Sequence, residues 1–403
     1  MKHLILLLGG VAVVGFAEPG PQKLSLDQAL DMARIHSPEL KAARLHTQAA
    51  SQAVEASGRW KNPSLNTKAE GVGGDLDGFN DAEYEIMLKQ TFERGGKRKY
   101  DRAGAEKSMG LYFQAEAEKE MALLAEVRLA FIEVFAQQEI GKVRAEQEQL
   151  GRALVEVARK KQQTGGGSEL EVVQAELALE EILLSQTCCF GDLEAARIHL
   201  ASLVGMDETT MPELEGAYYV LEKIEGRAIG NRHPALRRLD AQMDVMQAQA
   251  AGAKARDAAD ITLGAGYKYE AADEVNTFVL TASMPLNFVR SGKAQQASEL
   301  IRVDALQAEK EELRRALQQE LSMLIAIYNG AKVEVEMTRD RLTPKAERAY
   351  ELSKAGYEAG RFSWFELIHA QHQLAEIRVR YIEALKDAHT ARAKISRFMK
   401  EGI

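Results

Sequence analysis

Two kinds of hydrophobic pattern alternate along this chain. Long stretches with apolar residues at helical spacing predict helices, and short stretches in which every second residue is apolar predict strands. The longest helical stretch covers about 97–163, and another covers 169–204. Two shorter helices are predicted before them, one opened by a capping box at 25–28 and one that follows Ser37-Pro38 and ends near Ser57.

Strand-like alternation occurs in two pairs of short segments, one pair within about 64–93 and the other within about 260–288. Segments of about ten residues with one apolar face are typical of strands in a membrane barrel. A water-soluble hairpin packed on a helix has the same pattern and remains the alternative. In the barrel interpretation, the residues that face lipid are Ile261, Leu263, Tyr267, Phe278 and Leu280.

The order of these elements occurs twice. A shift of 196 places Pro38 on Pro234, and a shift of 195 places Gly165 on Gly360. A nearly constant offset over separate blocks predicts two repeats, at 18–206 and 225–403, joined by a linker at 207–224. Each repeat has a β-hairpin, about 64–93 or 260–288, and a long helical hairpin, 97–204 or 293–400. Pro344 predicts a kink or short break within the second long helix.

These elements are insufficient to form a closed pore in one chain. Two hairpins supply only four strands, whereas a closed barrel in a bilayer needs at least eight. A helix of roughly 65 residues, at about 1.5 Å per residue, is about 100 Å long and cannot be buried in one small globule. The fold class is therefore mainly α with short β-hairpins, completed by other copies of the chain.

Composition and charge exclude several classes of protein. The chain has 403 residues and a formal net charge of −8, and it has no basic run of five or more, so a nucleic-acid partner is not expected. No proline lies between Pro63 and Pro212, which favours long helices. The two cysteines, Cys188 and Cys189, are adjacent, which excludes a disulfide framework within one chain and a zinc site of the usual spacing.

The first 17 residues have the pattern of a signal peptide. Lys2 precedes an apolar run from Leu4 to Val14, and Gly15-Phe16-Ala17 is a small-x-small cleavage site. The run is too short to anchor the chain in a bilayer. The mature chain contains no stretch of 18 apolar residues. We therefore expect the protein to leave the cytoplasm.

Several motifs, taken in order, resemble those of the TolC-type outer-membrane efflux proteins. They are Leu26-x-x-Ala29-Leu30, Ser37-Pro38-Glu39-Leu40, Gln90-x-Phe92-x-x-Gly95-Gly96-Lys97-Arg98, Val172-Val173-Gln174-Ala175-Glu176-Leu177 and Leu367-Ile368-His369-Ala370-Gln371. The resemblance covers essentially the whole mature chain. The Gly-Gly-Lys-Arg element is similar to the heavy-metal branch of the family, the outer-membrane components of cobalt–zinc–cadmium pumps.

The resemblance implies a homotrimer, with a 12-stranded β-barrel in the outer membrane of a Gram-negative bacterium and an α-helical barrel in the periplasm. Such a duct contacts outer-membrane lipid and works with a periplasmic adaptor and an inner-membrane pump, for which the RND type is the candidate. It exports small molecules or metal cations passively, without a cofactor and without being an enzyme. A periplasmic coiled-coil scaffold without a pore is the alternative from another class.

The resemblance also assigns roles to the two helical turns. The residues expected to dock the adaptor are Thr164, Gly165, Gly166, Gly167, Ser168, Gly360, Arg361, Phe362 and Ser363. Those expected to narrow the pore are Glu366, His369 and Glu171. Both turns depart from the family's usual apolar tip residue, and His369 replaces the second acidic residue of a paired gate.

Simpler interpretations of the same residues remain open. Glu366 could be a solvated residue in the first turn of a helix, where the helix dipole stabilises it. His369 and His372, with Glu366, have a spacing that could hold a metal ion, but a pair on a surface helix is more often solvated, and no metal site is assigned. Trp364 is expected to lie exposed with Arg361 and Phe362, or else to pack the hairpin closed. No hydrolase, Walker or dinucleotide motif is present.

Overall fold

The computed structural model describes residues 23–72, 82–207, 209, 211–216, 218, 220–221, 224, 233–288 and 291–398. The predicted signal peptide at 1–17 lies outside the described residues. Of the glycines that separate the first two strand-like segments in the sequence, Gly73, Gly74 and Gly78 also lie outside them, as do residues 225–232 and six residues of the predicted linker at 207–224.

Long helices account for most of the chain, as predicted. The helices are α1 Leu26–His36, α2 Pro38–Ala56, α3 Lys97–Gln163, α4 Glu169–Val204, α5 Pro234–Ala255, α6 Gly292–Met337, α7 Thr343–Glu358 and α8 Trp364–Ser396. The strands are β1 Lys23–Ser25, β2 Ser64–Glu70, β3 Glu83–Phe92, β4 Glu213–Glu215, β5 Ile261–Glu270 and β6 Val275–Ser283. No helix among the described residues is both long enough and apolar enough to cross a membrane.

The chain divides into two compact units. Among the described residues, the turn unit comprises those within 23–33, 130–220 and 342–383, and the sheet unit comprises those within 34–129, 221–341 and 384–398. Each unit therefore draws on both halves of the sequence, which means that neither repeat folds as a separate domain.

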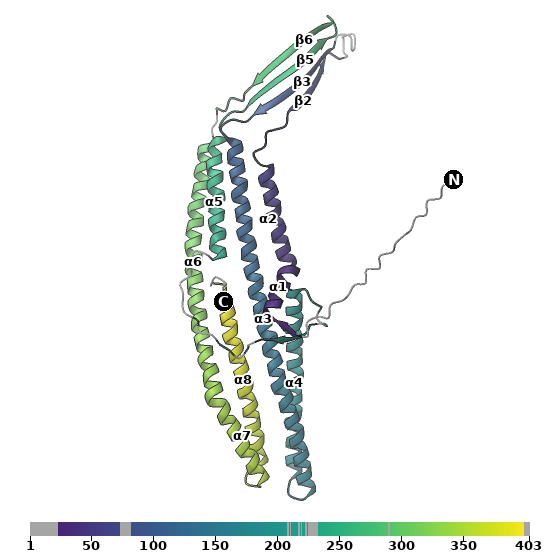
Figure 1. The fold of residues 1–403 in the computed structure, drawn as a ribbon, viewed down its shortest axis with the longest axis vertical. Helices are drawn as coiled ribbons and strands as arrows, with labels where there is room; N and C mark the ends of the chain where they lie inside the picture. The colour runs from purple at the N-terminus through teal and green to yellow at the C-terminus, as the bar shows by residue number, and fades with distance from the viewer. Residues whose placement is uncertain are drawn as a thin grey trace, which may run out of the picture. The chain divides into compact units, whose positions relative to one another are not determined.

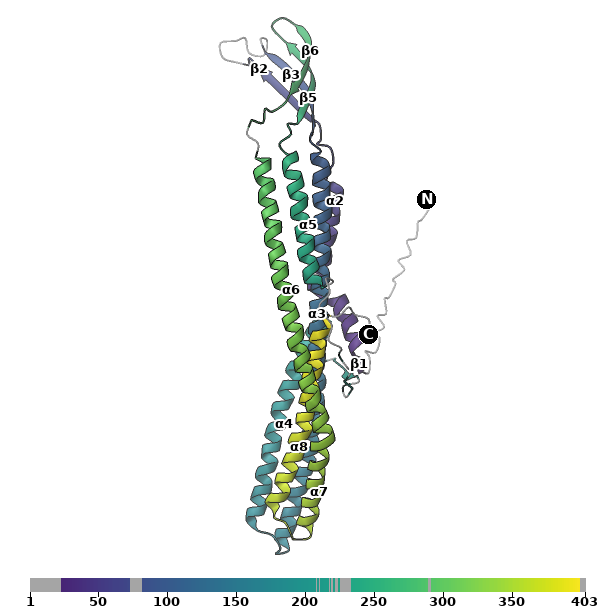
Figure 2. The ribbon, with the colours of Figure 1, turned by 90° about the vertical axis from the view of Figure 1, so that its left-hand side faces the viewer.

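In the turn unit, the C-terminal part of α3 lies beside α4, and α7 lies beside α8 (Figures 1 and 2). A hydrophobic core joins the two hairpins along their facing sides. Its buried members are Val155, Ala158, Val172, Ala175, Tyr350, Tyr357, Trp364, Leu367 and Ala370. Small alanines alternate with large side chains in this set, so the helices can approach closely without leaving voids.

The segment predicted as a linker, 207–224, contains a short strand. Its strand β4 pairs in parallel with β1, with Leu24 opposite Leu214. Tyr218 donates a hydrogen bond to the carbonyl of Ile382 at 3.1 Å and stacks on Phe135 with ring centroids 4.9 Å apart. The sequence analysis missed both strands because three-residue segments are too short to show alternation.

In the sheet unit, α2, the first part of α3, α5 and α6 lie alongside one another, and the strands form one antiparallel sheet with the order β2-β3-β5-β6 (Figures 1 and 2). The central pair is β3 and β5, one from each repeat, with Phe92 opposite Ile261. The strand predicted to reach 288 ends at Ser283 instead. Pro285 explains this difference, since proline has no N–H for the strand ladder.

Two local predictions about helices are confirmed. At the start of α1, the Ser25 backbone N–H donates to Gln28 Oε1 at 3.0 Å and the Gln28 N–H donates to Ser25 Oγ at 3.3 Å, which is a capping box. Before Pro344, residues Thr338–Leu342 form a π-helical segment between α6 and α7. Proline removes one backbone donor and crowds the preceding turn, so the interruption lies where the sequence predicts it.

Candidate functional site

Both helical turns of the turn unit have the same backbone structure. In the first turn, the N–H of Gly165 donates to Gln162 O at 3.0 Å and that of Gly166 donates to Lys161 O at 2.9 Å. In the second, the N–H of Gly360 donates to Tyr357 O at 3.0 Å and that of Arg361 donates to Gly356 O at 2.8 Å. These pairs are related by the shift of 195 found in the sequence.

The glycines Gly165 and Gly360 explain this shared geometry. Their φ angles are 77° and 68°, in the left-handed region that side chains with a Cβ rarely adopt. Each glycine reverses the chain at the end of a helix, and a serine three residues later caps the next helix. Ser168 Oγ accepts from the Glu171 N–H at 3.2 Å, and Ser363 Oγ accepts from the Glu366 N–H at 3.4 Å.

The residues predicted to dock an adaptor lie on these two turns. Gly167 is half-buried, and the other eight are exposed: Thr164, Gly165, Gly166, Ser168, Gly360, Arg361, Phe362 and Ser363. Both turns belong to one unit whose hairpins share a core, so the structure brings the two groups of residues to one region. Their role in docking stays a prediction.

The two turns differ in where they place a large side chain. In the second, Phe362 lies over Gly356, and a Cβ on that glycine would be 2.1 Å from the phenylalanine ring. In the first, the equivalent of Gly356 is Lys161 and the equivalent of Phe362 is Gly167. A Cβ on Gly167 would be 3.2 Å from both the carbonyl carbon of Lys161 and Oε2 of Glu171. Each turn therefore holds one large side chain and one glycine, in opposite order.

Glu366 forms a capping box in the second turn. Its Oε2 accepts the Ser363 backbone N–H at 2.7 Å and the Ser363 hydroxyl at 2.9 Å. The backbone hydrogen bond, followed by the hydroxyl, lowers the pKa of Glu366 below its usual value, because both stabilise the ionised carboxylate. Glu366 is thus ionised and held at the exposed start of α8.

Glu171, the repeat mate, has different partners. Its carboxylate lies 3.9 Å from Lys161 Nζ, and its buried Oε2 has no hydrogen-bond partner among the described residues. Lys161 Nζ also lies 4.2 Å above the ring of Tyr357, on the other hairpin. The first turn therefore uses its glutamate and lysine at the junction of the hairpins rather than in a capping box.

The expectation that Trp364 is exposed with Arg361 and Phe362 is wrong. Trp364 is only 3% exposed and meets Tyr357 edge-on, with ring centroids 5.4 Å apart. It packs the two hairpins together, which was the alternative interpretation. Phe365 is 71% exposed and stacks on His369, with ring centroids 6.1 Å apart.

The histidine pair does not form a metal centre with its neighbours. His369 stacks on Phe365, and His372 Nε2 lies 4.0 Å from a carboxylate oxygen of Glu376. Among the described residues, no three His, Cys, Asp or Glu side chains are grouped so that they could hold a metal ion. His369 and Glu366 are both exposed, and their part in a constriction stays a prediction.

The sheet has one apolar and one polar face. Register places Tyr267 between Ile86 and Phe278, and Ala265 between Leu88 and Leu280, so the apolar residues of all three strands share one face. Phe278 and Leu280 are 89% and 84% exposed. Of the other residues predicted to face lipid, Leu263 and Tyr267 are exposed and Ile261 is half-buried.

The opposite face carries charge. Lys268 Nζ lies 2.7 Å from Glu83 and 2.8 Å from Glu270, which come from the neighbouring strand and from its own. The sheet therefore has a row of apolar side chains on one face, whereas on the other face ion pairs lie at the end near Glu270, and Met87 and Val279 lie farther along.

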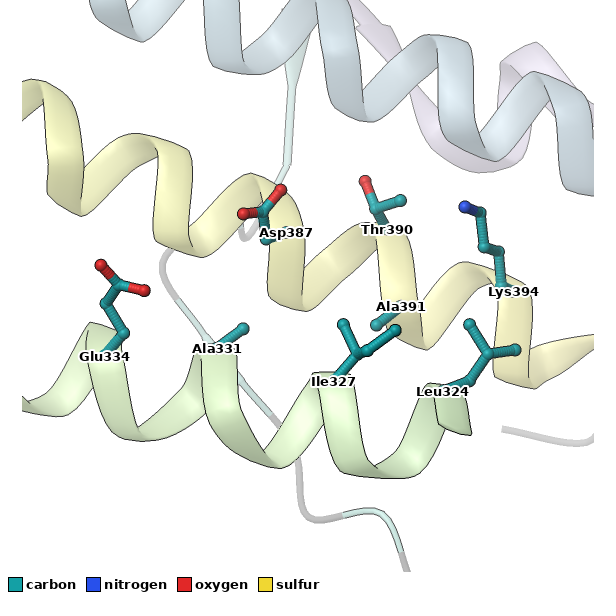
Figure 3. Close-up of a pocket in the computed structure, with 8 residues that line it drawn as sticks. All are labelled: Leu324, Ile327, Ala331, Glu334, Asp387, Thr390, Ala391 and Lys394. Atoms are coloured by element: carbon teal, nitrogen blue, oxygen red, sulfur yellow. The ribbon is translucent and has the colours of Figure 1, made fainter. Parts of the chain in front are cut away.

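The sheet unit also contains a shallow groove between α6 and α8 (Figure 3). Its volume is about 390 Å³, with an apolar floor and charged residues at its rim. The residues that line it are Leu324, Ile327, Ala331, Glu334, Asp387, Thr390, Ala391 and Lys394. None of them was singled out from the sequence.

Comparison with known protein families decides what this architecture is. The family described as outer membrane efflux protein matches residues 29–206 and again 227–399. The chain belongs to the outer membrane efflux protein family. The two matched regions confirm the duplicated plan, and membership places this efflux protein in the outer membrane.

Individual relatives of this efflux protein agree with the family assignment. The cobalt-zinc-cadmium resistance protein CzcC of Cupriavidus metallidurans is 23% identical over 380 residues, which cover 93% of this chain and 90% of the relative. Protein CyaE of Bordetella pertussis is 25% identical over 386 residues, covering 89% and 80%. The crystal structure of CusC has the same fold, with a TM-score of 0.79 at 16% identity, covering 94% and 92%.

The predicted fold class and family are therefore confirmed. Sequence reasoning missed the contact between Lys161 and Tyr357, which joins the two hairpins. It also missed Arg98, whose guanidinium lies 4.1 Å from the ring centroid of Trp60 at the base of the sheet. The basic run near Arg98 was a visible signal, but the partner ring is 38 positions away in the sequence.

Proposed function

We propose that this efflux protein is a passive duct, in which three copies of the chain form a barrel in the outer membrane and a helical tunnel in the periplasm. The observation that carries the proposal is the two-faced sheet. Its apolar face, with Phe278 and Leu280 almost fully exposed, suits lipid, and its charged face suits a water-filled lumen.

Incomplete surfaces of the single chain support assembly from several copies. The outer strands β2 and β6 each have only one neighbour within the described sheet, so both present an unpaired edge. Helix α4 has an apolar stripe at intervals of three, four and seven residues. Its members, all more than half exposed, are Leu170, Val173, Leu177 and Leu184. A second copy could cover this stripe by coiled-coil packing.

For the periplasmic end, the proposal assigns adaptor docking to the two helical turns and a constriction to Glu366, His369 and Glu171. Three symmetry-related Glu366 carboxylates, each ionised, would form a negative ring that favours cations. Arg361 and Phe362 are exposed and are of the residue types favoured at protein interfaces. An inner-membrane pump of the RND type would supply the energy.

For the cargo, we favour metal cations over drugs. The relative CzcC is a cobalt-zinc-cadmium resistance protein, and the ring at Glu366 suits cations. The name of CyaE indicates no metal, and both relatives share only about a quarter of their residues with this chain. The cargo therefore needs a direct test, in which a deletion strain is compared for tolerance of cobalt, zinc and cadmium and for tolerance of drugs. A loss of drug tolerance alone would reject the metal assignment.

The duct itself is tested by localisation and by a pair of substitutions. The wild-type protein should fractionate with the outer membrane as a detergent-soluble trimer. Leu280→Glu places a charge on the apolar face, where a lysine or arginine in the middle of the bilayer costs about 2–4 kcal/mol and a glutamate costs less, so trimer assembly should be impaired. Thr281→Glu places the same charge on the opposite face and should assemble. A soluble monomer in the periplasm, or equal behaviour of the two variants, would reject the duct and favour a scaffold.

A further inference from the structure

A basic and aromatic cluster lies where the sheet joins the helices. Arg98 lies with its guanidinium carbon 4.1 Å from the ring centroid of Trp60, and Trp60 meets Phe92 edge-on at 5.8 Å. Trp60 is 56% exposed and Phe92 is 38% exposed. Phe92 is the last residue of β3 and shares the apolar face with Ile86 and Leu88. The cluster therefore marks the end of the apolar face that is nearest the helices.

The charge of this region is opposite to that of the chain. Between residues 93 and 102 there are five basic and two acidic residues, although the chain as a whole has a net charge of −8. The inner basic residues are neutralised: Lys97 Nζ lies 2.7 Å from Asp260, and Lys61 Nζ lies 3.1 Å from Glu93. Arg102 Nε also lies 3.1 Å from Glu106, so the basic residues of this stretch without a carboxylate partner among the described residues are Arg94, Arg98 and Lys99.

Arg98 and Arg59 have no carboxylate partner among the described residues. Arg98 Nε donates to the carbonyl of Gly58 at 2.8 Å, and Arg59 Nε donates to that of Glu55 at 3.0 Å. A guanidinium has five N–H donors, so four remain on each side chain. The backbone bond and the Trp60 ring hold Arg98 in one orientation, which leaves its outer edge ready for a phosphate.

Among its described residues, the second repeat has no such cluster, although it has the same fold. The shift of 196 places Arg256 at the position of Trp60, Ala294 at that of Arg98 and Gln295 at that of Lys99. Phe288 matches Phe92 and is 86% exposed, with no aromatic neighbour of this kind among the described residues. A hairpin and a long helix can therefore be joined without the cluster, so connecting them does not explain why the first repeat carries it.

We propose that Arg98, Arg59 and Trp60 bind the headgroup of an anionic phospholipid in the periplasmic leaflet of the outer membrane. This inference rests on the proposed function, because the apolar face must be in lipid for its end to lie at headgroup level. Tryptophan is favoured at that level, where its ring is in the acyl region and its N–H in water. Basic side chains beside such a ring attract anionic lipids, and arginine binds a phosphate with two parallel hydrogen bonds.

The two tryptophans of the chain allow a direct test. Trp364 is buried in the turn unit, so Trp364→Phe leaves Trp60 as the only tryptophan. The full chain in this background is reconstituted into vesicles that contain a small fraction of brominated phosphatidylglycerol or brominated phosphatidylcholine. Bromine quenches tryptophan at short range. We expect the anionic lipid to quench Trp60 about fivefold more efficiently, as one basic residue near a surface would give.

Variants distinguish recognition of the anionic headgroup from insertion of the sheet into the bilayer. Arg98→Gln should bring the ratio of quenching by phosphatidylglycerol to quenching by phosphatidylcholine close to one. Arg98→Lys, which keeps the charge but not the planar group, should give an intermediate ratio. Arg237→Gln removes an arginine of α5 outside the cluster and should leave the ratio unchanged. Quenching by brominated phosphatidylcholine measures insertion in every variant, so a variant that fails to assemble is recognised.

Three outcomes would overturn the proposal: equal quenching by both lipids, a preference that survives Arg98→Gln, or loss of the preference when inorganic phosphate replaces chloride at constant ionic strength. The last would show a site for free phosphate. Quenching by neither lipid would instead contradict the membrane location of the sheet, which is the proposed function and not the headgroup site.

Discussion

The two helical turns of the turn unit share one backbone and differ in their side chains. Three main-chain hydrogen bonds and the serine cap of the first turn recur in the second at nearly the same lengths. One example is the bond from Thr164 N to Lys160 O and its equivalent from Ala359 N to Ala355 O, both 3.1 Å. Yet the first turn holds Lys161 beside Gly167, and the second holds Gly356 beside Phe362.

This difference shows what duplication preserved. Positions that need a particular backbone conformation, a glycine with positive φ and a capping serine, are the same in both turns. At one pair of equivalent positions the order of a large residue and a glycine is reversed, with Lys161 and Gly167 in the first turn and Gly356 and Phe362 in the second. As a result, the first turn presents glycines to solvent and places a cation between the hairpins, whereas the second exposes Arg361 and Phe362.

The largest predicted difference between the turns concerns Gly356. Gly356→Ala should destabilise the protein by about 1–3 kcal/mol, because the new Cβ would overlap the Phe362 ring and displace it. The double variant Gly356→Ala with Phe362→Gly should recover most of that loss, since it removes the ring that the new Cβ would meet. Thermal unfolding followed by Trp364 fluorescence, which reports on the same hairpin, measures both.

Gly141→Ala is the matched control, because a Cβ at this glycine in α3 would meet no atom within 4 Å. It should be neutral or stabilising by up to about 1 kcal/mol, since alanine favours a helix over glycine. If Gly356→Ala were as mild as this control, Phe362 would not be packed over Gly356, and the reversed order of glycine and large residue would not change how the two turns pack.

The next difference concerns the glutamates. Glu366→Ala should destabilise the protein more than Glu171→Ala, because it removes the carboxylate that accepts two hydrogen bonds from Ser363. Glu171→Ala should cost only a few tenths of a kcal/mol, since its partner Lys161 is 3.9 Å away and partly exposed. Urea unfolding of the two single variants provides the comparison, and equal losses would show that the capping box is not what distinguishes the turns.

The same pair predicts a pH dependence. The pKa of Glu366 is lower in the folded chain than in the unfolded chain, so its contribution to stability is present above the ordinary glutamate pKa. It is lost as the pH falls through the lowered folded value. The loss caused by Glu366→Ala should therefore shrink in acid, and a loss that grows in acid would contradict the assigned hydrogen bonds.

The sequence predicted the parts of this structure that depend on local pattern. The helices around 97–163 and 169–204, the strand pairs and the two turns follow from spacing, glycine and proline, which act within a few residues. The strand expected to reach 288 ends at Ser283. Pro285 was visible in the sequence, but the apolar alternation continues past it, so it was not recognised as the end of the strand. The two repeats could be recognised because comparing the sequence with itself at a shift of 195 or 196 requires no knowledge of contacts.

What could not be predicted depends on residues distant in the sequence. The burial of Trp364 is set by Tyr357 and by the other hairpin, so a turn rich in basic and aromatic residues was wrongly expected to expose it. The capping role of Glu366 was visible as Ser363 followed by glutamate three positions later, yet the ring interpretation took precedence. Lys161 gave no signal, because its contact with Tyr357 joins helices from different repeats.

The smallest predicted difference is between Gly165→Ala and Gly360→Ala. Both residues have φ near 70°, and a Cβ added to either glycine would meet no atom within 4 Å, so strain alone should decide the effect, at about 1–2 kcal/mol each. The two losses should agree within about 0.5 kcal/mol in urea unfolding, which is the margin within which the effects of independent substitutions usually add. If Gly360→Ala cost clearly more, the side chains Arg361 and Phe362 would constrain the backbone of the second turn, and the two turns would differ in more than their side chains. Equal losses would instead mean that the backbone of each turn is fixed by its glycine and serine and does not depend on the residues between them.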